Sequence, residues 1–277
     1  KNIFLILLGV VFLLLLFALT GFFETPRPDG RISILGGGPI IFGRWMGFGV
    51  IALFFLPIKM KYIFRLIFIL IFLVYCLISG SRGPFIALLL SFIFYFFLNF
   101  RKIFLRLSVL LLLLSAIFFS TNLYKDISEL GRTDRVFLNI AKRGGSSEST
   151  QTRYELAERS YDLMLKYPFG VGAGNWQFKA NQYNPTHLMA HEYPHNLFFE
   201  IINEYGILAG ILLFLFILHI TYISFSKMNN YSNKKSLYPL LFYLWIFLLL
   251  NAMLSGSLND SRLLFIIACC VLIINPL

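Results

Sequence analysis

The chain has 277 residues, of which 58% are hydrophobic and only 13% are charged, with a formal net charge of +11 at pH 7. Soluble domains carry about 25% charged residues, so the composition excludes an ordinary soluble enzyme. The charges are segregated into the segments between apolar blocks, and we therefore expect no nucleic-acid partner. The three cysteines, Cys76, Cys269 and Cys270, lie inside apolar blocks, where we expect neither disulfides nor a metal site.

Apolar blocks long enough to be candidate membrane helices recur along the chain. In order they are residues 2–20, 45–58, 62–79, 84–100, 103–120, 195–225, 237–255 and 263–277. The predicted fold class is therefore all-α, a polytopic integral membrane protein with about eight transmembrane helices. The first residue is Lys rather than Met, and we expect further helices to precede it in a longer parent protein.

Basic residues mark alternate joints between these blocks. They are Lys59, Lys61, Arg65, Arg101, Lys102, Arg106, Lys227, Lys234 and Lys235. The positive-inside rule places these joints in the cytoplasm and the others outside it. The sequence thus predicts three regions: membrane helices with short outer loops in residues 1–120, a large outer loop with short helices in 121–194, and three membrane helices in 195–277.

The large outer loop is too long and too well patterned to be a simple linker. Residues 150–167 are predicted to form a helix whose apolar face carries Ala157, Tyr161, Met164, Leu165 and Pro168. The next residues, PFGVGAGNWQF, contain three glycines and predict a tight turn. Their spacing is reminiscent of phosphate-binding loops, but no strand precedes the turn and no helix is predicted to follow it, so that interpretation has little support.

Two arginines of this helix are assigned different faces. Arg159 lies four residues after Glu155, and an ion pair on the exposed face explains it. At about 100° per residue, Arg153 aligns instead with Ser160 and Met164 on the predicted buried side. An arginine in that position needs an anionic partner, which makes Arg153 a candidate ligand-binding residue.

Residues 191–195, HEYPH, match the H-E-x-x-H pattern in which two histidines of one helical face bind zinc. Pro194 argues against this interpretation, because proline is best tolerated in the first turn of a helix. A helix that starts near Pro194 leaves His191 outside it, and no third ligand is evident. We therefore predict no metal site.

The same histidine begins a second pattern. If residues 195–225 form one helix, a single stripe within an arc of about 100° carries His195, Asn196, Phe199, Asn203, Gly206 and Gly210. Glycines four residues apart allow close packing of membrane helices, and polar residues in such helices often mark function. His195 is suited to proton transfer near neutral pH and is the candidate catalytic residue. The alternative is that the stripe serves packing alone, and the role of the neighbouring Glu200 and Glu204 stays open.

The turn SGSRGPF at residues 79–85 contains Arg82 as its only charge. A fixed guanidinium there can bind a phosphate group in bidentate geometry. The alternative is an ordinary interfacial arginine that meets lipid phosphate. Arg31, in the glycine-rich stretch 27–44, lies on the same predicted side, although a flexible loop is the favoured interpretation of that stretch.

These patterns resemble a known family, the bacterial O-antigen ligases and O-antigen polymerases. Residues 195–210 (HN, nine residues, G, three residues, G) are similar to its signature, with Ala209 where the family often has Gly. The SRG turn at 81–83 resembles the family's arginine turn, and the segment from Arg153 to Gly174 is similar to its outer loop. The resemblance covers about residues 30–260 of the chain.

The resemblance implies a metal-independent membrane glycosyltransferase without a cofactor. Such an enzyme moves a polysaccharide from an undecaprenyl-diphosphate-linked donor to a hydroxyl of lipid A-core, at the periplasmic side of the bacterial inner membrane. It implies that Arg82 and Arg153 bind the diphosphate and that His195 accepts the proton or positions a reactant. Supporting positions are Asn196, Arg31, Arg159, Asn203, Gly206 and Gly210.

Two alternatives stay open at this point. A polymerase of the same family, which extends O-antigen, capsule or exopolysaccharide on a growing glycan acceptor, would use the same residues. A transporter of lipid-linked sugars would place its ionisable residues near the membrane midplane. Here such residues cluster at the predicted outer face, apart from Glu200, Glu204 and His219.

Overall fold

The computed structural model describes residues 2–23, 32–35, 37–99, 148–183, 193–230 and 236–274. Within these ranges the repeating secondary structure is helical, which confirms the all-α prediction. The chain divides into two compact units, Lys1–Gly144 and Gly145–Leu277, and each is described by itself. Arg31 and the predicted span 103–120 lie outside the described residues.

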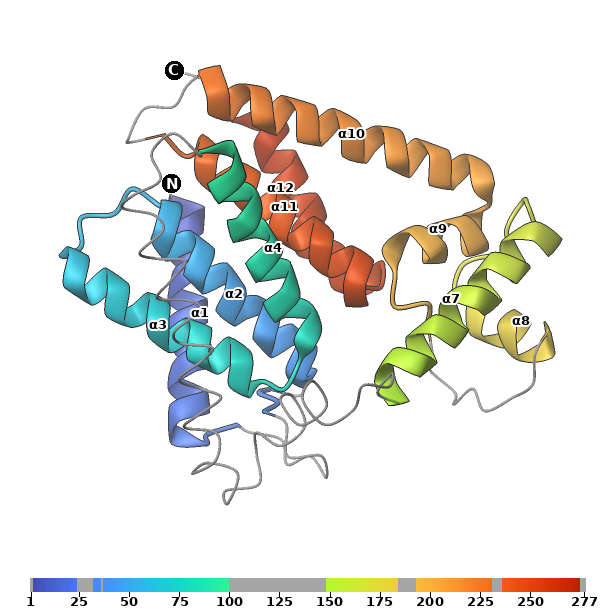
Figure 1. Cartoon of the computed structure of the whole chain (residues 1–277), viewed down its shortest axis with the longest axis horizontal. Coiled ribbons are helices and arrows are strands. Elements are labelled where there is room, and N and C mark those ends of the chain that lie inside the picture. Colours follow the sequence, from blue (N-terminus) through green and yellow to red (C-terminus); the bar gives the residue numbers. More distant parts are fainter. Residues whose placement is uncertain are drawn as a thin grey trace. The chain divides into compact units, whose positions relative to one another are not determined.

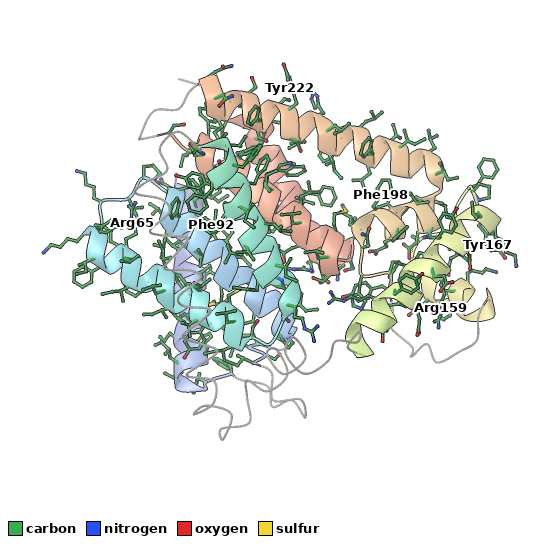
Figure 2. The ribbon with its side chains drawn as sticks, in the orientation of Figure 1. Arg65, Phe92, Arg159, Tyr167, Phe198 and Tyr222 are labelled. Atoms are coloured by element: carbon green, nitrogen blue, oxygen red, sulfur yellow. The ribbon has the colours of Figure 1, made fainter. Side chains whose placement is uncertain are left out.

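The helices of the first unit are α1 (Asn2–Thr20), α2 (Gly38–Phe55), α3 (Tyr62–Ile78) and α4 (Arg82–Leu98). Helix α2 packs against the other three (Figure 1). Gly49 permits the close approach, because a Cβ there would lie 2.8 Å from Val11 of α1 and 3.0 Å from Phe72 of α3. On its other side, the ring of Phe54 meets the ring of Phe92 of α4 edge to face, with centroids 5.3 Å apart (Figure 2).

Helix α2 begins at Gly38, whereas the sequence predicted a start at residue 45. The glycine run before it favours a loop, but Pro39 stands in the first turn of the helix. Proline is well tolerated there, because its missing N–H would have had no intrahelical partner. The correction matters for Arg44, which lies inside the helix and is buried.

The second unit contains six α-helices and a 3₁₀ turn among its described residues. They are α7 (Glu148–Lys166), α8 (Trp176–Tyr183), α9 (Leu197–Tyr205), α10 (Ile207–Asn230), α11 (Tyr238–Ser255), η3 (Asn259–Ser261) and α12 (Arg262–Ile273). Helix α10 packs against α9, α11 and α12. Trp245 of α11 donates to the hydroxyl of Thr221 in α10 at 2.8 Å. Lys227 of α10 donates to the carbonyls of Val271 and Ile274 at the end of α12, at 2.7 and 2.8 Å.

In the described part of the chain, α1, α2, α10 and α11 are long and apolar enough to cross a membrane. Helices α3 and α4 are apolar but shorter, and α12 has only 12 residues. The chain is therefore a helical membrane protein. The predicted number of about eight spans stays a prediction, because it depends on these shorter helices and on residues outside the described ranges.

Helices α7 and α8 form a small core of their own beside α9 (Figure 1). Its buried members are Leu156, Leu163, Trp176 and Ala180. The indole of Trp176 donates to the hydroxyl of Ser160 at 3.2 Å, which joins the two helices across the glycine turn. Helix α8 corrects the prediction that no helix follows that turn. Its sequence, WQFKANQY, is short and has little apolar periodicity, and the packing of Trp176 and Ala180 against α7 stabilises it.

Candidate functional site

The predicted span 195–225 is not one helix. Helix α9 ends at Tyr205 and α10 begins at Ile207, and Gly206 stands between them with φ 91° and ψ 168°. This region of backbone space is open almost only to glycine. The interpretation of His195 to Gly210 as one helical stripe was therefore wrong, because a stripe requires an unbroken helix.

Backbone hydrogen bonds stabilise the junction between α9 and α10. Residues 168–172 of the glycine turn run beside residues 203–207, and we call this pair of segments the glycine clasp. Val171 donates to Asn203 at 2.8 Å and Gly172 donates to Glu204 at 2.9 Å. In the other direction, the first amide of α10, that of Ile207, donates to Pro168 at 2.9 Å. The outer-loop helices are thus bonded to the junction of α9 and α10.

Two glycines face each other inside the clasp. A Cβ on Gly170 would lie 2.6 Å from the carbonyl oxygen of Glu204 and 2.6 Å from the amide nitrogen of Gly206. A Cβ on Gly206 would lie 2.8 Å from the carbonyl carbon of Phe169. Both residues also have positive φ. The glycines of this turn therefore permit close contact between two backbones. The phosphate-loop interpretation of their spacing, which had little support from the sequence, is not needed to explain them.

Gly210 lies in the first turn of α10 and permits close packing there. A Cβ there would collide with the side chain of Ile202 in α9, so that α10 can fold closely against α9 only with glycine at this position. This agrees with the prediction that Gly210 permits close packing. The packing partner is the preceding helix, on the other side of the Gly206 break.

Asn196 is the N-cap of α9. Its carboxamide oxygen accepts from the amides of Phe198 and Phe199 at 2.9 and 3.1 Å, and its nitrogen donates to the carbonyl of Met253 in α11 at 2.9 Å. One side chain thus caps one helix and ties it to another. These bonds give the predicted supporting role of Asn196 a physical basis, and the helix begins at Leu197, three residues after Pro194.

His195 immediately precedes this cap and lies outside the helix. Its φ of 55° is in the left-handed region, which is uncommon for a residue with a side chain. Its ring lies 4.1 Å from the ring of Tyr193, centroid to centroid, and its side chain is half-buried. Such a backbone costs about 1–3 kcal/mol and persists only where the surroundings enforce it. The two tethers of Asn196 fix the residue that follows His195. His191 and Glu192 of the H-E-x-x-H pattern lie outside the described residues.

The buried face of α7 differs from the predicted one. Leu156, Ser160 and Leu163 are buried, whereas Tyr161 and Leu165 of the predicted apolar face are more than half exposed. Helical spacing alone allows either set, and contact with α8 selects the first. Ser160 was placed on the buried side correctly.

The predicted positions of the two arginines of α7 change with the buried face. Arg159, which an exposed ion pair was expected to explain, is only 6% exposed. Its guanidinium lies 3.9 Å from the carboxylate of Glu155, which is itself half-exposed. Arg153 is half-buried at the opposite border of the Leu156–Ser160–Leu163 stripe. Figure 2 shows Arg159 on α7 and Phe198 on the neighbouring α9. Two guanidinium groups therefore flank the stripe, and Arg159 is the more buried of them.

The carboxylate of Glu200 in α9 is bonded to the segment that follows α11. Glu200 accepts from the amide of Leu258, which follows α11, at 2.8 Å. Burial raises the pKa of Glu200 to about 7 although this hydrogen bond lowers it, and the charges of Glu204 and Asp260 raise it further. Helix α9 is not among the membrane-spanning candidates. Glu200 is thus a carboxyl that can change its charge near neutral pH.

Asn203 is almost fully buried in α9. Its nitrogen donates to the carbonyl of Phe199 at 2.7 Å, and its carboxamide oxygen is buried without a hydrogen-bond donor among the described residues. An unsatisfied buried acceptor costs about 1–3 kcal/mol. A hydrogen bond to this oxygen from a bound molecule, or from a residue outside the described ranges, would therefore stabilise the site.

Arg82 belongs to the first unit and is the first residue of α4. The turn before it is held by Ser79, whose hydroxyl donates to Cys76 at 2.7 Å and accepts from the amide of Ser81 at 3.3 Å. Gly43 of α2 lies against this turn, because a Cβ there would be 2.9 Å from the hydroxyl of Ser79. Arg82 is therefore half-buried on a turn of defined shape, at the N-terminus of a helix, where anions are favoured.

Sequence reasoning overlooked Arg44, the neighbour of Gly43 in α2. It is 9% exposed within a helix that can span a membrane. The available signal was its charge inside an apolar stretch, since intramembrane ionisable residues are functional candidates by default. It was missed because the predicted helix began one residue after it.

Comparison with known proteins adds one match. A family-wide sequence profile described as O-antigen ligase matches residues 66–215, which is more than half of the chain. The matched range includes Arg82, Arg153 and His195 and ends within α10. The comparison with curated proteins finds no match.

Proposed function

The chain belongs to the O-antigen ligase family, and from this premise we propose that it is a membrane glycosyltransferase that ligates a polysaccharide from undecaprenyl diphosphate to a hydroxyl of lipid A-core. The family itself supports a ligase or polymerase type of transferase. The observation that carries the proposal is the fixed position of His195, whose strained backbone is held next to the double tether of Asn196.

In the proposed reaction the acceptor oxygen attacks the anomeric carbon of the donor sugar. The bond from that carbon to the diphosphate oxygen breaks, and undecaprenyl diphosphate leaves with the electron pair. The proton of the acceptor hydroxyl passes to His195. One in-line displacement of this kind inverts the configuration at the anomeric carbon.

The leaving diphosphate gains negative charge as the bond breaks, so that fixed cations accelerate the reaction. Arg153 and Arg159, which flank the buried stripe of α7, are proposed to supply this charge in the second unit. Arg82, on its defined turn in the first unit, is proposed to contribute as well. Loss of one such electrostatic contact typically costs about 3–4 kcal/mol in the transition state, or roughly 10²–10³ in kcat. No metal ion is part of the proposed mechanism.

The proposed location is the bacterial inner membrane, with the site open to the periplasm. Basic residues support this orientation, because Lys227 lies at the opposite end of α10 from the glycine clasp. The proposed arrangement remains three regions, with membrane helices in residues 1–120 and 195–277 and the outer loop in 121–194.

The test uses the whole protein in detergent with a lipid-diphosphate-linked glycan and a lipid A-core acceptor. We expect ligated product from the wild type, with and without EDTA. His195→Ala and Arg153→Ala should each reduce turnover by at least about 10². His219→Ala is the matched control for the histidine, because His219 is exposed on α10, and Lys179→Ala is the control for the arginine, because Lys179 lies on α8 and has no part in the proposed site.

The other outcomes are decisive. Full activity of His195→Ala would remove the proposed proton acceptor, and inactivation by EDTA would favour a metal enzyme built on HEYPH. Donor chains that lengthen without labelling the acceptor would identify a polymerase. Movement of donor across vesicle membranes without any glycosyl transfer would identify a transporter.

A further inference from the structure

The face of α7 that the core leaves free carries a row of large apolar side chains. Tyr154, Tyr161 and Leu165 are 68%, 53% and 61% exposed, and Phe169 in the glycine turn is 95% exposed. We call these four residues the aromatic ridge. The first three recur at helical spacing on one side of α7, and Phe169 continues the row beyond its end. Contiguous exposed apolar surface of this kind marks a contact with a partner or a membrane.

The glycine clasp places the end of the ridge at the start of a membrane-spanning candidate. Ile207, the first residue of α10, donates its amide hydrogen to Pro168, and Gly206 lies against the backbone of Phe169. From there the apolar side chains of α10 are exposed in turn, as a lipid-facing helix requires. They include Leu208, Ile211, Leu212, Phe214, Leu215 and Leu218. The end of the ridge therefore lies beside the first turn of α10.

Counting along α10 gives the depth of this junction. Lys227 lies near the polar end of the helix, where Asn229 and Asn230 follow it. Ile207 lies twenty residues earlier in α10, and at about 1.5 Å per residue this places it about 30 Å from Lys227. The hydrocarbon core of a bilayer is also about 30 Å thick. With Lys227 at one boundary, Ile207 lies at the opposite boundary, and so does Phe169, which follows the Pro168 that Ile207 bonds.

We propose that the aromatic ridge is a membrane-surface contact, in which Phe169 and Leu165 insert into the headgroup–acyl boundary of a phospholipid bilayer. Aromatic residues are enriched at that depth. Lys166 is exposed next to Leu165 and its ammonium group reaches lipid phosphate. Glu158 shares the exposed side of α7 but lies two turns farther from the clasp, where the helix rises into water. The outer loop is thus an interfacial element fastened to α10.

This contact depends only on α10 crossing the bilayer and holds whatever reaction the protein catalyses. For the proposed transferase, this contact determines where α7 lies relative to the membrane. A diphosphate linked to a membrane lipid lies at the headgroup level, and the ridge holds α7, with Arg153 and Arg159, close to that level.

The experiment measures the immersion depth of single positions. In the full chain, Cys76, Cys269 and Cys270 are replaced by serine. A nitroxide label is then attached to Phe169→Cys, Leu165→Cys, Glu158→Cys or Leu212→Cys, in liposomes of phosphatidylethanolamine and phosphatidylglycerol. Accessibility to oxygen, which concentrates in the bilayer, is compared with accessibility to a water-soluble nickel chelate. Leu212 is the reference inside the bilayer and Glu158 the reference in water.

We expect the oxygen-to-nickel ratio to fall from Leu212 through Phe169 and Leu165 to Glu158, with a several-fold difference between Phe169 and Glu158. A ratio at Phe169 equal to that at Glu158 would overturn the proposal. A label at Phe169 that neither reagent reaches would also overturn it, because the ridge would then be covered by protein. Phe169→Trp gives an independent measure, since brominated lipids should quench its emission beyond that of wild type.

Discussion

The two units join their helices in different ways. In the first, apolar side chains and helical glycines bring α1, α3 and α4 onto α2, as Gly49 does between Val11 and Phe72. In the second, directed hydrogen bonds cross between elements, from Asn196 to Met253 and through the glycine clasp. Apolar packing tolerates small shifts, whereas a hydrogen bond sets distance and direction. The difference shows which unit holds a side chain such as His195 in one geometry.

Gly206→Ala should have the largest effect. Its backbone region is open almost only to glycine and the new Cβ meets the Phe169 backbone, so we expect a loss of about 3 kcal/mol or more and no measurable transfer. Thermal unfolding in detergent and the ligation assay measure both. Gly43→Ala is the control in the first unit, where the new Cβ meets the hydroxyl of Ser79 and the ring of Pro84, and we expect about 1 kcal/mol. Equal losses in the two variants would remove the contrast between the units.

Asn196→Ala should follow. It removes the cap of α9 and the bond to Met253, and each is worth about 1 kcal/mol, so we expect a loss of about 2 kcal/mol. Asn196→Ser keeps a capping oxygen and should lose about half as much. Urea titration of the detergent-solubilised protein distinguishes the two variants. If serine and alanine behave alike, the cap contributes nothing and the loss belongs to the bond to Met253.

Glu200→Gln should change the pH dependence of stability. The pKa of Glu200 in the folded protein, about 7, is above its ordinary value of 4.5, because burial disfavours the charged form. The protonated carboxyl therefore favours folding fully below about pH 4.5, and this contribution is lost as the pH rises through 7. Glutamine stays neutral, so the melting temperature of the variant should exceed that of wild type at pH 8 and match it near pH 4. A melting temperature at pH 8 that is higher for wild type than for the variant would show that the ionised carboxylate stabilises the fold.

Gly9→Ala should have the smallest effect and the opposite sign. Gly9 lies within α1, and a Cβ there meets nothing within 4 Å. Alanine is the better helix former by about 0.5–1 kcal/mol, so the variant should be unchanged or slightly more stable. A clearly lower melting temperature would mean that another part of the protein packs against Gly9. The packing described for the first unit contains no such contact.

The sequence predicted much of the fold and part of the site. The positions of α1, α3, α4 and α11 follow from long apolar blocks, because a membrane helix must satisfy its backbone internally and carry apolar side chains. Helix α7 was predicted from its spacing, but its buried face was wrong. A helix with apolar residues on two sides does not reveal which side meets protein and which meets lipid.

The residues themselves determined that this is a helical membrane protein, that a histidine follows a polar loop, and that arginines precede it. Composition and order are enough for these conclusions, because the bilayer restricts the architecture so strongly. Only the tertiary structure decided that Gly206 breaks the helix, that Gly170 lies against it, and that Arg159 is buried. These depend on contacts between segments sixteen or more residues apart, and local periodicity carries no information on which distant segment approaches a helix or a glycine.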